Sequence, residues 1–220
     1  GKVGAEGFKK YYVYTSNVDN FFRRAGFESE NLCEIHGCLS RWIPRGSEDE
    51  HELPTVHHLP EEHRFKVDPQ TFLLEGEDMG TAGVPLHPSG SGDALRPAVL
   101  MFDDEYPPLL NLLKAEQDRY QAWEAKMEEE LSGNSSARVV ILEIGCGTRV
   151  PAIRQEIDWV IKDCQEKVGS RADSQGPRVE LIRINPSDEG PAESHVTHIK
   201  LPALLALAEI EKELEHLADS

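Results

Sequence analysis

Two short apolar runs near the start of the chain each end in polar residues, and this pattern constrains the fold more than any other feature. The run at 11–14 predicts a buried strand, which gives way to a polar loop at 15–19. A short helical stretch follows and stops at Gly26. The second run, at 32–35, predicts another strand that delivers His36. The sequence therefore brings two polar loop ends close together.

These loop ends carry side chains that suit a binding site. In open α/β sheets, ligands bind where the strands end, so we expect Asn17, Asp19 and His36 to lie near one another. Asn and Asp hold polar ligands, and an imidazole exchanges a proton near neutral pH. Two capping residues and a hydrogen-bonded structural histidine would explain the same pattern equally well.

The rest of the chain alternates between strand and helix patterns. Strands are expected at 98–102, 139–144 and 179–184, and helices from Pro107 to Gly133, at 152–166 and at 201–217. The strand at 139–144 is expected to be buried, because five of its six residues are apolar. This alternation predicts an α/β fold, a Rossmann-like doubly wound parallel sheet.

Composition excludes several classes of protein. The net charge is −17 and no basic patch is present, so we expect no nucleic-acid partner. No apolar run approaches membrane-spanning length, so we expect no membrane partner. The four cysteines show no disulfide pattern, which favours an intracellular protein, cytoplasmic or nuclear. The oligomeric state is not readable.

Ordered segments along the chain resemble the sirtuin (Sir2) family of NAD-dependent protein lysine deacylases, in its bacterial-type subgroup. They read YVYTSNVDNFFRRAGF at 12–27, CEIHG at 33–37, LRPAVLMFDDEYP at 95–107, ILEIGCGTRVPAIR at 141–154, LIRINP at 181–186 and IKLPALLALAEI at 199–210. The resemblance implies transfer of an acyl group from lysine to the ADP-ribose of NAD, with release of nicotinamide. It implies NAD as co-substrate and an acyl-lysine protein as partner.

The resemblance also assigns roles to residues. His36 would be the general base, Asn17 would order the ribose and a water, and Asp19 would accept from the nicotinamide carboxamide. Further cofactor contacts would come from Thr15, Ser16, Gly145, Cys146, Gly147 and Asn185. Val99, Phe102 and Asp103 would bind the substrate peptide, with the strand adding to it by β-pairing. Three positions depart from the family pattern: Ser16 replaces Gln, and Asn20 and Asp103 replace Gly.

Residues 44–96 stand where sirtuins have a zinc module. The two cysteine pairs are absent from their expected places near Pro44 and Ser47 and near His87 and Gly90. The histidines there (His51, His57, His58, His63 and His87) show no two ligand pairs at matching spacing, so we expect no metal and zinc is unlikely. The predicted organisation is a first core part at 1–43, a degenerate insert at 44–96 and a second core part at 97–220. Because the family's glycine-rich NAD-phosphate loop is missing before residue 11, we also expect the core to be incomplete at its N-terminus.

Two other functions remain open. The segment at 141–154 also resembles the first motif of S-adenosylmethionine-dependent methyltransferases, with an acidic residue before a Gly-x-Gly turn. Its late position, with one clear strand after it and Asn185 at the next strand end, disfavours that function. The lost zinc ligands favour a second alternative, a non-catalytic sirtuin-like protein that binds NAD, ADP-ribose or a peptide.

Overall fold

The structure is a computed structural model that describes residues 10–45, 52–60, 63–76, 83–90, 92–168, 178–187 and 196–218. Ser47 and His51, which the sequence places in the insert, lie outside these ranges. By its internal contacts the chain divides into an N-terminal unit, residues 12–120, and a C-terminal unit, residues 121–220 with 1–11. The three-part division predicted from the sequence stays a prediction.

The N-terminal unit begins with a parallel strand pair. Strands β1 (Val13–Thr15) and β2 (Leu32–Glu34) flank the one-turn helix α1 (Phe21–Arg24) and the 3-10 helix η1 (Ser29–Asn31). The pair is in register from Val13 opposite Leu32 to Thr15 opposite Glu34. Both predicted strands and the short helix are therefore present, and each starts or ends within two residues of its expected bounds.

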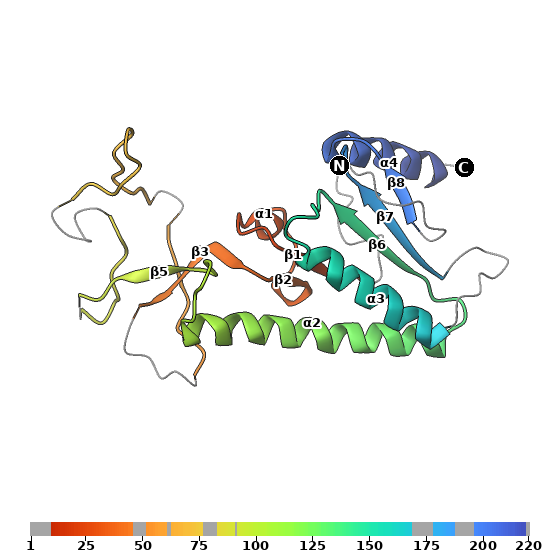
Figure 1. Cartoon of the computed structure of the whole chain (residues 1–220), viewed down its shortest axis with the longest axis horizontal. Helices are drawn as coiled ribbons and strands as arrows, with labels where there is room; N and C mark the ends of the chain where they lie inside the picture. The colour runs from red at the N-terminus through yellow and green to blue at the C-terminus, as the bar shows by residue number, and fades with distance from the viewer. Residues whose placement is uncertain are drawn as a thin grey trace. The chain divides into compact units, whose positions relative to one another are not determined.

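A second, antiparallel sheet follows in the same unit (Figure 1). It has the order β4-β3-β5, from β3 (Gly37–Pro44), β4 (His57–His58) and β5 (Leu95–Val99). The sequence did not predict β3. It placed the last strand at 98–102, which is wrong, because the strand ends at Val99 and the chain turns after it. Ile43, Ala98 and Leu109 form the buried core of this unit.

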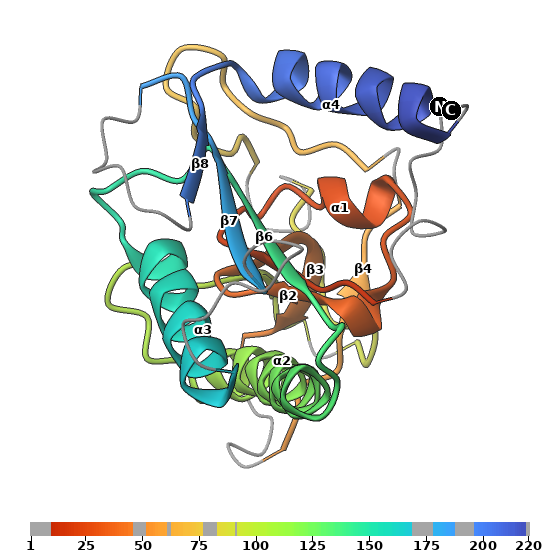
Figure 2. The ribbon, with the colours of Figure 1, turned by 90° about the vertical axis from the view of Figure 1, so that its right-hand side faces the viewer.

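The long helix α2 (Pro107–Gly133) contributes its first half to the N-terminal unit and its second half to the C-terminal unit. The latter unit adds β6 (Val139–Ile144), α3 (Ala152–Val168), β7 (Val179–Ile184), β8 (Val196–Ile199) and α4 (Ala203–Ala218). Figure 2 shows β6, β7 and β8 side by side, and all pairs in this sheet are parallel. The chain is a mixed α/β protein with parallel sheets, as the sequence predicted.

The two faces of the β6-β7-β8 sheet differ. On one face Val139, Ile141 and Leu181 pack with α2 and α3 in the core of this unit. On the other face Val140, Leu142 and Ile144 are 55%, 45% and 39% exposed. The prediction that this strand is buried is therefore wrong, because β6 is the edge strand of the sheet and only one of its faces is packed. No helix among the described residues has the length and apolar character needed to cross a membrane.

Helix α2 places an acidic side chain against α3 in the C-terminal unit. Burial, and after it the neighbouring charges of Glu156, Glu128 and Asp163, together raise the pKa of Glu124 to about 7. A carboxyl whose pKa is higher in the folded state than in the unfolded state favours folding when protonated. That contribution is complete below the unfolded value of 4.5 and is lost as the pH rises through about 7.

We therefore expect Glu124→Gln to raise the melting temperature at pH 8 and to leave it close to wild type at pH 4. The amide stays neutral and keeps the size of the side chain, so it removes the cost of a buried carboxylate. Thermal unfolding followed by circular dichroism measures the difference. Glu129→Gln, at an exposed position of the same helix, changes the net charge equally and is the control. Equal effects of the two variants at pH 8 would contradict the prediction.

Candidate functional site

The parallel pairing of β1 and β2 brings the two predicted loop ends to one edge of the N-terminal unit. Thr15 lies opposite Glu34, and the backbone N–H of Ile35 donates to the carbonyl of Thr15 at 3.0 Å. The loop at 15–19 and the turn that carries His36 are thus neighbours, as the sequence predicted. Parallel strands deliver their following loops to the same edge, which is where open α/β sheets bind ligands.

Local hydrogen bonds shape the loop at 15–19. The buried Oγ1 of Thr15 accepts from the backbone N–H of Asn17 at 3.1 Å, and Oδ1 of Asp19 accepts from the N–H of Phe21 at 3.0 Å. Asn20 takes a left-handed conformation, with φ of 64°. Asn tolerates that conformation better than most residues, so it can stand where the sirtuin pattern has Gly. The side chain of Asn17 is exposed.

His36 lies in the turn between β2 and β3, and its backbone is fixed. Its carbonyl accepts from the N–H of Leu100 at 2.9 Å, while the N–H of Leu39 donates to the carbonyl of Val18 at 2.9 Å. His36 is half-buried, and no side chain or backbone group among the described residues hydrogen-bonds its ring. These bonds join the loop at 15–19, the turn at 35–37 and the segment at 99–103, which we call the three-loop site.

The third segment is a turn and not the predicted strand. Val99 ends β5 opposite Gly37, Phe102 is 97% exposed and Asp103 has φ of 60°. Arg96 holds the turn by an ion pair to the carboxylate of Asp104. This pair lowers the pKa of Asp104, against the opposing effect of its burial. The pairing of β3 with β5 ends at Val99, so Phe102 lies outside β5.

The other predicted residues gather in the C-terminal unit, at the ends of β6 and β7. The carbonyl of Cys146 accepts from Nδ2 of Asn185 at 3.1 Å and from Nη2 of Arg154 at 2.9 Å. Gly145 has φ of 68°, and a side chain added at Gly145 or Gly147 would meet no heavy atom within 4 Å. We call residues 145–147 with Asn185 the glycine loop site. Its backbone is open to a ligand at the carboxyl edge of a parallel sheet.

The glycine loop is supported by the buried acid that precedes it, a role that the sequence did not predict. Glu143 is 1% exposed and pairs with Nη2 of Arg154 at 3.1 Å and with Nε of Arg183 at 2.9 Å. Burial, together with the Glu143 charge, raises the pKa of the Cys146 thiol, so this cysteine is not a reactive thiolate. A single acid within an otherwise apolar strand was the sequence signal that could have revealed this support.

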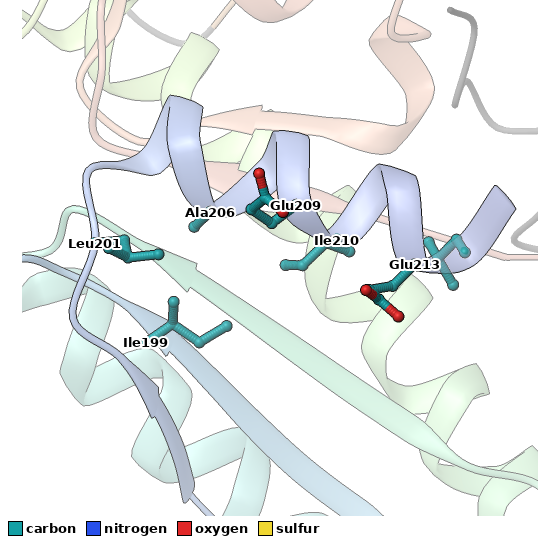
Figure 3. A pocket seen from close by; sticks show the side chains of 7 residues that line it. Ile199, Leu201, Ala206, Glu209, Ile210 and Glu213 are labelled. Atoms are coloured by element: carbon teal, nitrogen blue, oxygen red, sulfur yellow. The ribbon is translucent and has the colours of Figure 1, made fainter. Parts of the chain in front are cut away.

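Neither site coincides with the hollow in the C-terminal unit. That hollow, of about 270 Å³, lies between α4 and β8 (Figure 3). Its lining residues are Ile199, Leu201, Ala206, Glu209, Ile210, Glu213 and Leu214. It is mainly apolar and contains none of the site residues predicted from the sequence. Among the described residues, no three His, Cys, Asp or Glu side chains are grouped to hold a metal.

Comparison with solved structures identifies a similar fold. A structure described as "Sir2-p53 peptide-NAD+" matches with a TM-score of 0.51 at 15% identity, over 92% of this chain and 62% of that chain. A second, Sir2 with the inhibitor EX-527, 2'-O-acetyl-ADP-ribose and deacetylated p53 peptide, gives 0.47 at 16% identity, over 92% and 64%. No known family profile and no curated protein matches the chain. At this identity the first match shows a sirtuin-like fold, and the chain spans about three fifths of that protein's length.

At Gly37 the backbone of β5 comes close to that of β3. Gly37 has φ of 84°, and a Cβ added there would lie 1.9 Å from the carbonyl oxygen of Ala98. We expect Gly37→Ala to destabilise the chain, because both backbones would have to move apart. Gly26→Ala is the control, since Gly26 has φ of 91° with nothing within 4 Å.

The control should lose only about 1–2 kcal/mol, the cost of a left-handed backbone for a residue with a Cβ. Gly37→Ala should lose clearly more, because the steric clash adds to that cost. Urea unfolding of both variants gives the two free energies. Equal losses would show that the close approach does not exist in solution.

Proposed function

We propose that the chain acts as a sirtuin-like, NAD-dependent protein lysine deacylase. The observation that carries this function is the three-loop site. Residues 15–19, His36 and the turn at 99–103 are distant in sequence but are joined by backbone hydrogen bonds in one unit. These are the segments to which the sirtuin resemblance assigns the ribose, the base and the peptide.

His36 is the proposed general base. It would accept a proton from a ribose hydroxyl, since an imidazole exchanges protons near neutral pH. Its ring is half-buried and unbonded among the described residues, and its backbone is fixed at both the carbonyl and the adjoining Ile35. Asn17 would orient the ribose through its exposed amide, and Asp19 would accept from the carboxamide.

NAD, when bound, supplies the ribose that accepts the acyl group and the nicotinamide that leaves. The glycine loop site fits such a ligand, because the backbone at Gly145 and Gly147 is open and lies at a carboxyl strand end. Asn185 would contact the adenosine ribose. One of its amide hydrogens is already donated to Cys146, so it also holds the loop in shape. Phe102 and Asp103 would lie along the acyl-lysine peptide.

A non-catalytic binding protein is the second candidate. Thr15 and Asp19 already accept local hydrogen bonds from the backbone, as purely structural capping residues would. The methyltransferase alternative loses part of the argument against it, because two strands, β7 and β8, follow β6, not one. Asn185 still stands where that class is expected to have an acidic residue.

We expect His36→Ala to lower NAD-dependent deacylation by about 10²- to 10⁴-fold, the usual contribution of a general base. The measurement is deacylated peptide and released nicotinamide from an acyl-lysine peptide, by mass spectrometry. His58→Ala, an exposed histidine in β4 of the same unit, is the control and should be fully active. Turnover retained in His36→Ala would rule out the role of this residue.

Wild-type chain that binds NAD in a calorimetric titration but turns over no acyl peptide would favour the non-catalytic candidate. Binding of S-adenosylmethionine in place of NAD would favour the methyltransferase. The three functions are therefore separable with one protein sample and two ligands.

A further inference from the structure

The short helix α1 carries an arginine that connects two parts of the three-loop site. Nε and Nη2 of Arg23 each lie 3.0 Å from Oε2 of Glu34. Arg23 also donates through Nη1 to Oγ of Ser29, and its Nη2 lies 4.0 Å from Oε1 of Glu116. An arginine fork that makes several charge-assisted bonds fixes direction as well as distance.

The ion pair between Arg23 and Glu34 connects the segments on either side of it in the chain. Helix α1 begins two residues after Asp19, whose Oδ1 accepts from the N–H of Phe21, the first residue of the helix. Glu34 ends β2, two residues before His36. The ion pair between Arg23 and Glu34 therefore ties the element that follows the first loop to the strand that leads into the second.

Helix α1 is short and carries no buried side chain. It is a single turn of four residues, and one helical turn is unstable in isolation. Phe22 packs edge-on against Phe27, with ring centroids 5.4 Å apart, but both belong to the same segment. Among the described residues, Arg23 forms the ion pair that joins α1 to β2, and its side chain is 21% exposed.

The partner of Arg23 is itself held rigidly. Glu34 lies 3.4 Å from Nη2 of Arg41, which also pairs with Glu116, and the three residues are 2–6% exposed. Burial lowers the pKa of Arg41, but its bond to Glu116 and the charges of both acids outweigh this and raise it. Arg41 thus remains charged, and Glu34 is a fixed point for α1.

We propose that Arg23 is a positioning residue for the three-loop site, which holds the loop of Asn17 and Asp19 in place against the turn of His36. Its contribution to catalysis rests on the proposed deacylase function. The guanidinium touches neither His36 nor Asn17, so its effect is on geometry. A loop displaced by about 1 Å costs up to about a hundredfold in rate.

The test compares Arg23→Gln, Arg23→Lys and the control Arg24→Gln in the full chain. Arg24 neighbours Arg23 on the same helix, but its guanidinium lies over the ring of Phe21, 5.5 Å from its centroid, and outside the ion-pair network. We expect Arg23→Gln to lower kcat about tenfold or more while the KM for the peptide changes little. Arg23→Lys keeps the positive charge but loses the planar guanidinium, so its kcat should lie between those of wild type and Arg23→Gln. Arg24→Gln should match wild type.

A second readout does not need activity. The imidazole Cε1–H signal of His36, assigned by its loss in His36→Ala, should shift in Arg23→Gln and remain in place in Arg24→Gln. If wild type deacylates nothing but this shift occurs, the positioning holds and the proposed function fails. A shift absent in both Arg23 variants overturns the proposal, even when their melting temperatures fall. If Arg23→Gln does not fold, the kcat and the His36 Cε1–H signal of Arg23→Lys test the proposal in its place.

Discussion

The N-terminal unit depends on the buried pairing of Glu34 and Glu116 with Arg41. Each of these charges would be costly to bury alone, and the cost is offset only when all are present in good geometry. The three residues come from β2, α2 and β3, so the requirement to pair them fixes three elements at once. The backbone N–H of Glu34 adds a bond to Glu116 at 3.4 Å. The hydrophobic effect alone, which has no direction, would not specify this arrangement.

The C-terminal unit uses the same arrangement at its own site. Glu34 lies two residues before His36, and Glu143 lies two residues before Gly145. Each acid is buried at the end of a parallel strand and is held by two arginines, one of them on a helix. Buried ion pairs thus support the strand end before each loop. Such preorganised support leaves the loop residues available for binding.

The sequence predicted most of the elements because their periodicity was clear, as in 139–144 and 179–184, which match β6 and β7 in full. Strand β3 was missed because Ser, Arg and Pro interrupt its apolar pattern, and β8 because four residues carry too little signal. That the loops at 15–19 and 35–37 are neighbours was predictable, because they follow two strands expected to lie in one sheet. The sequence marks Glu143 as a lone acid in an apolar run, but it does not show which arginines on other elements hold Glu34 and Glu143.

The exposed face of β6 has a consequence for how the molecule behaves in concentrated solution. Val140, Leu142 and Ile144 offer apolar side chains on an edge strand, whose unpaired backbone groups can accept another chain. The net charge of −17 opposes such contact by long-range repulsion between molecules. Salt reduces the range of that repulsion to about 10 Å at 0.1 M ionic strength, and it does not weaken the attraction between apolar surfaces. We therefore expect self-association through β6 to increase with ionic strength.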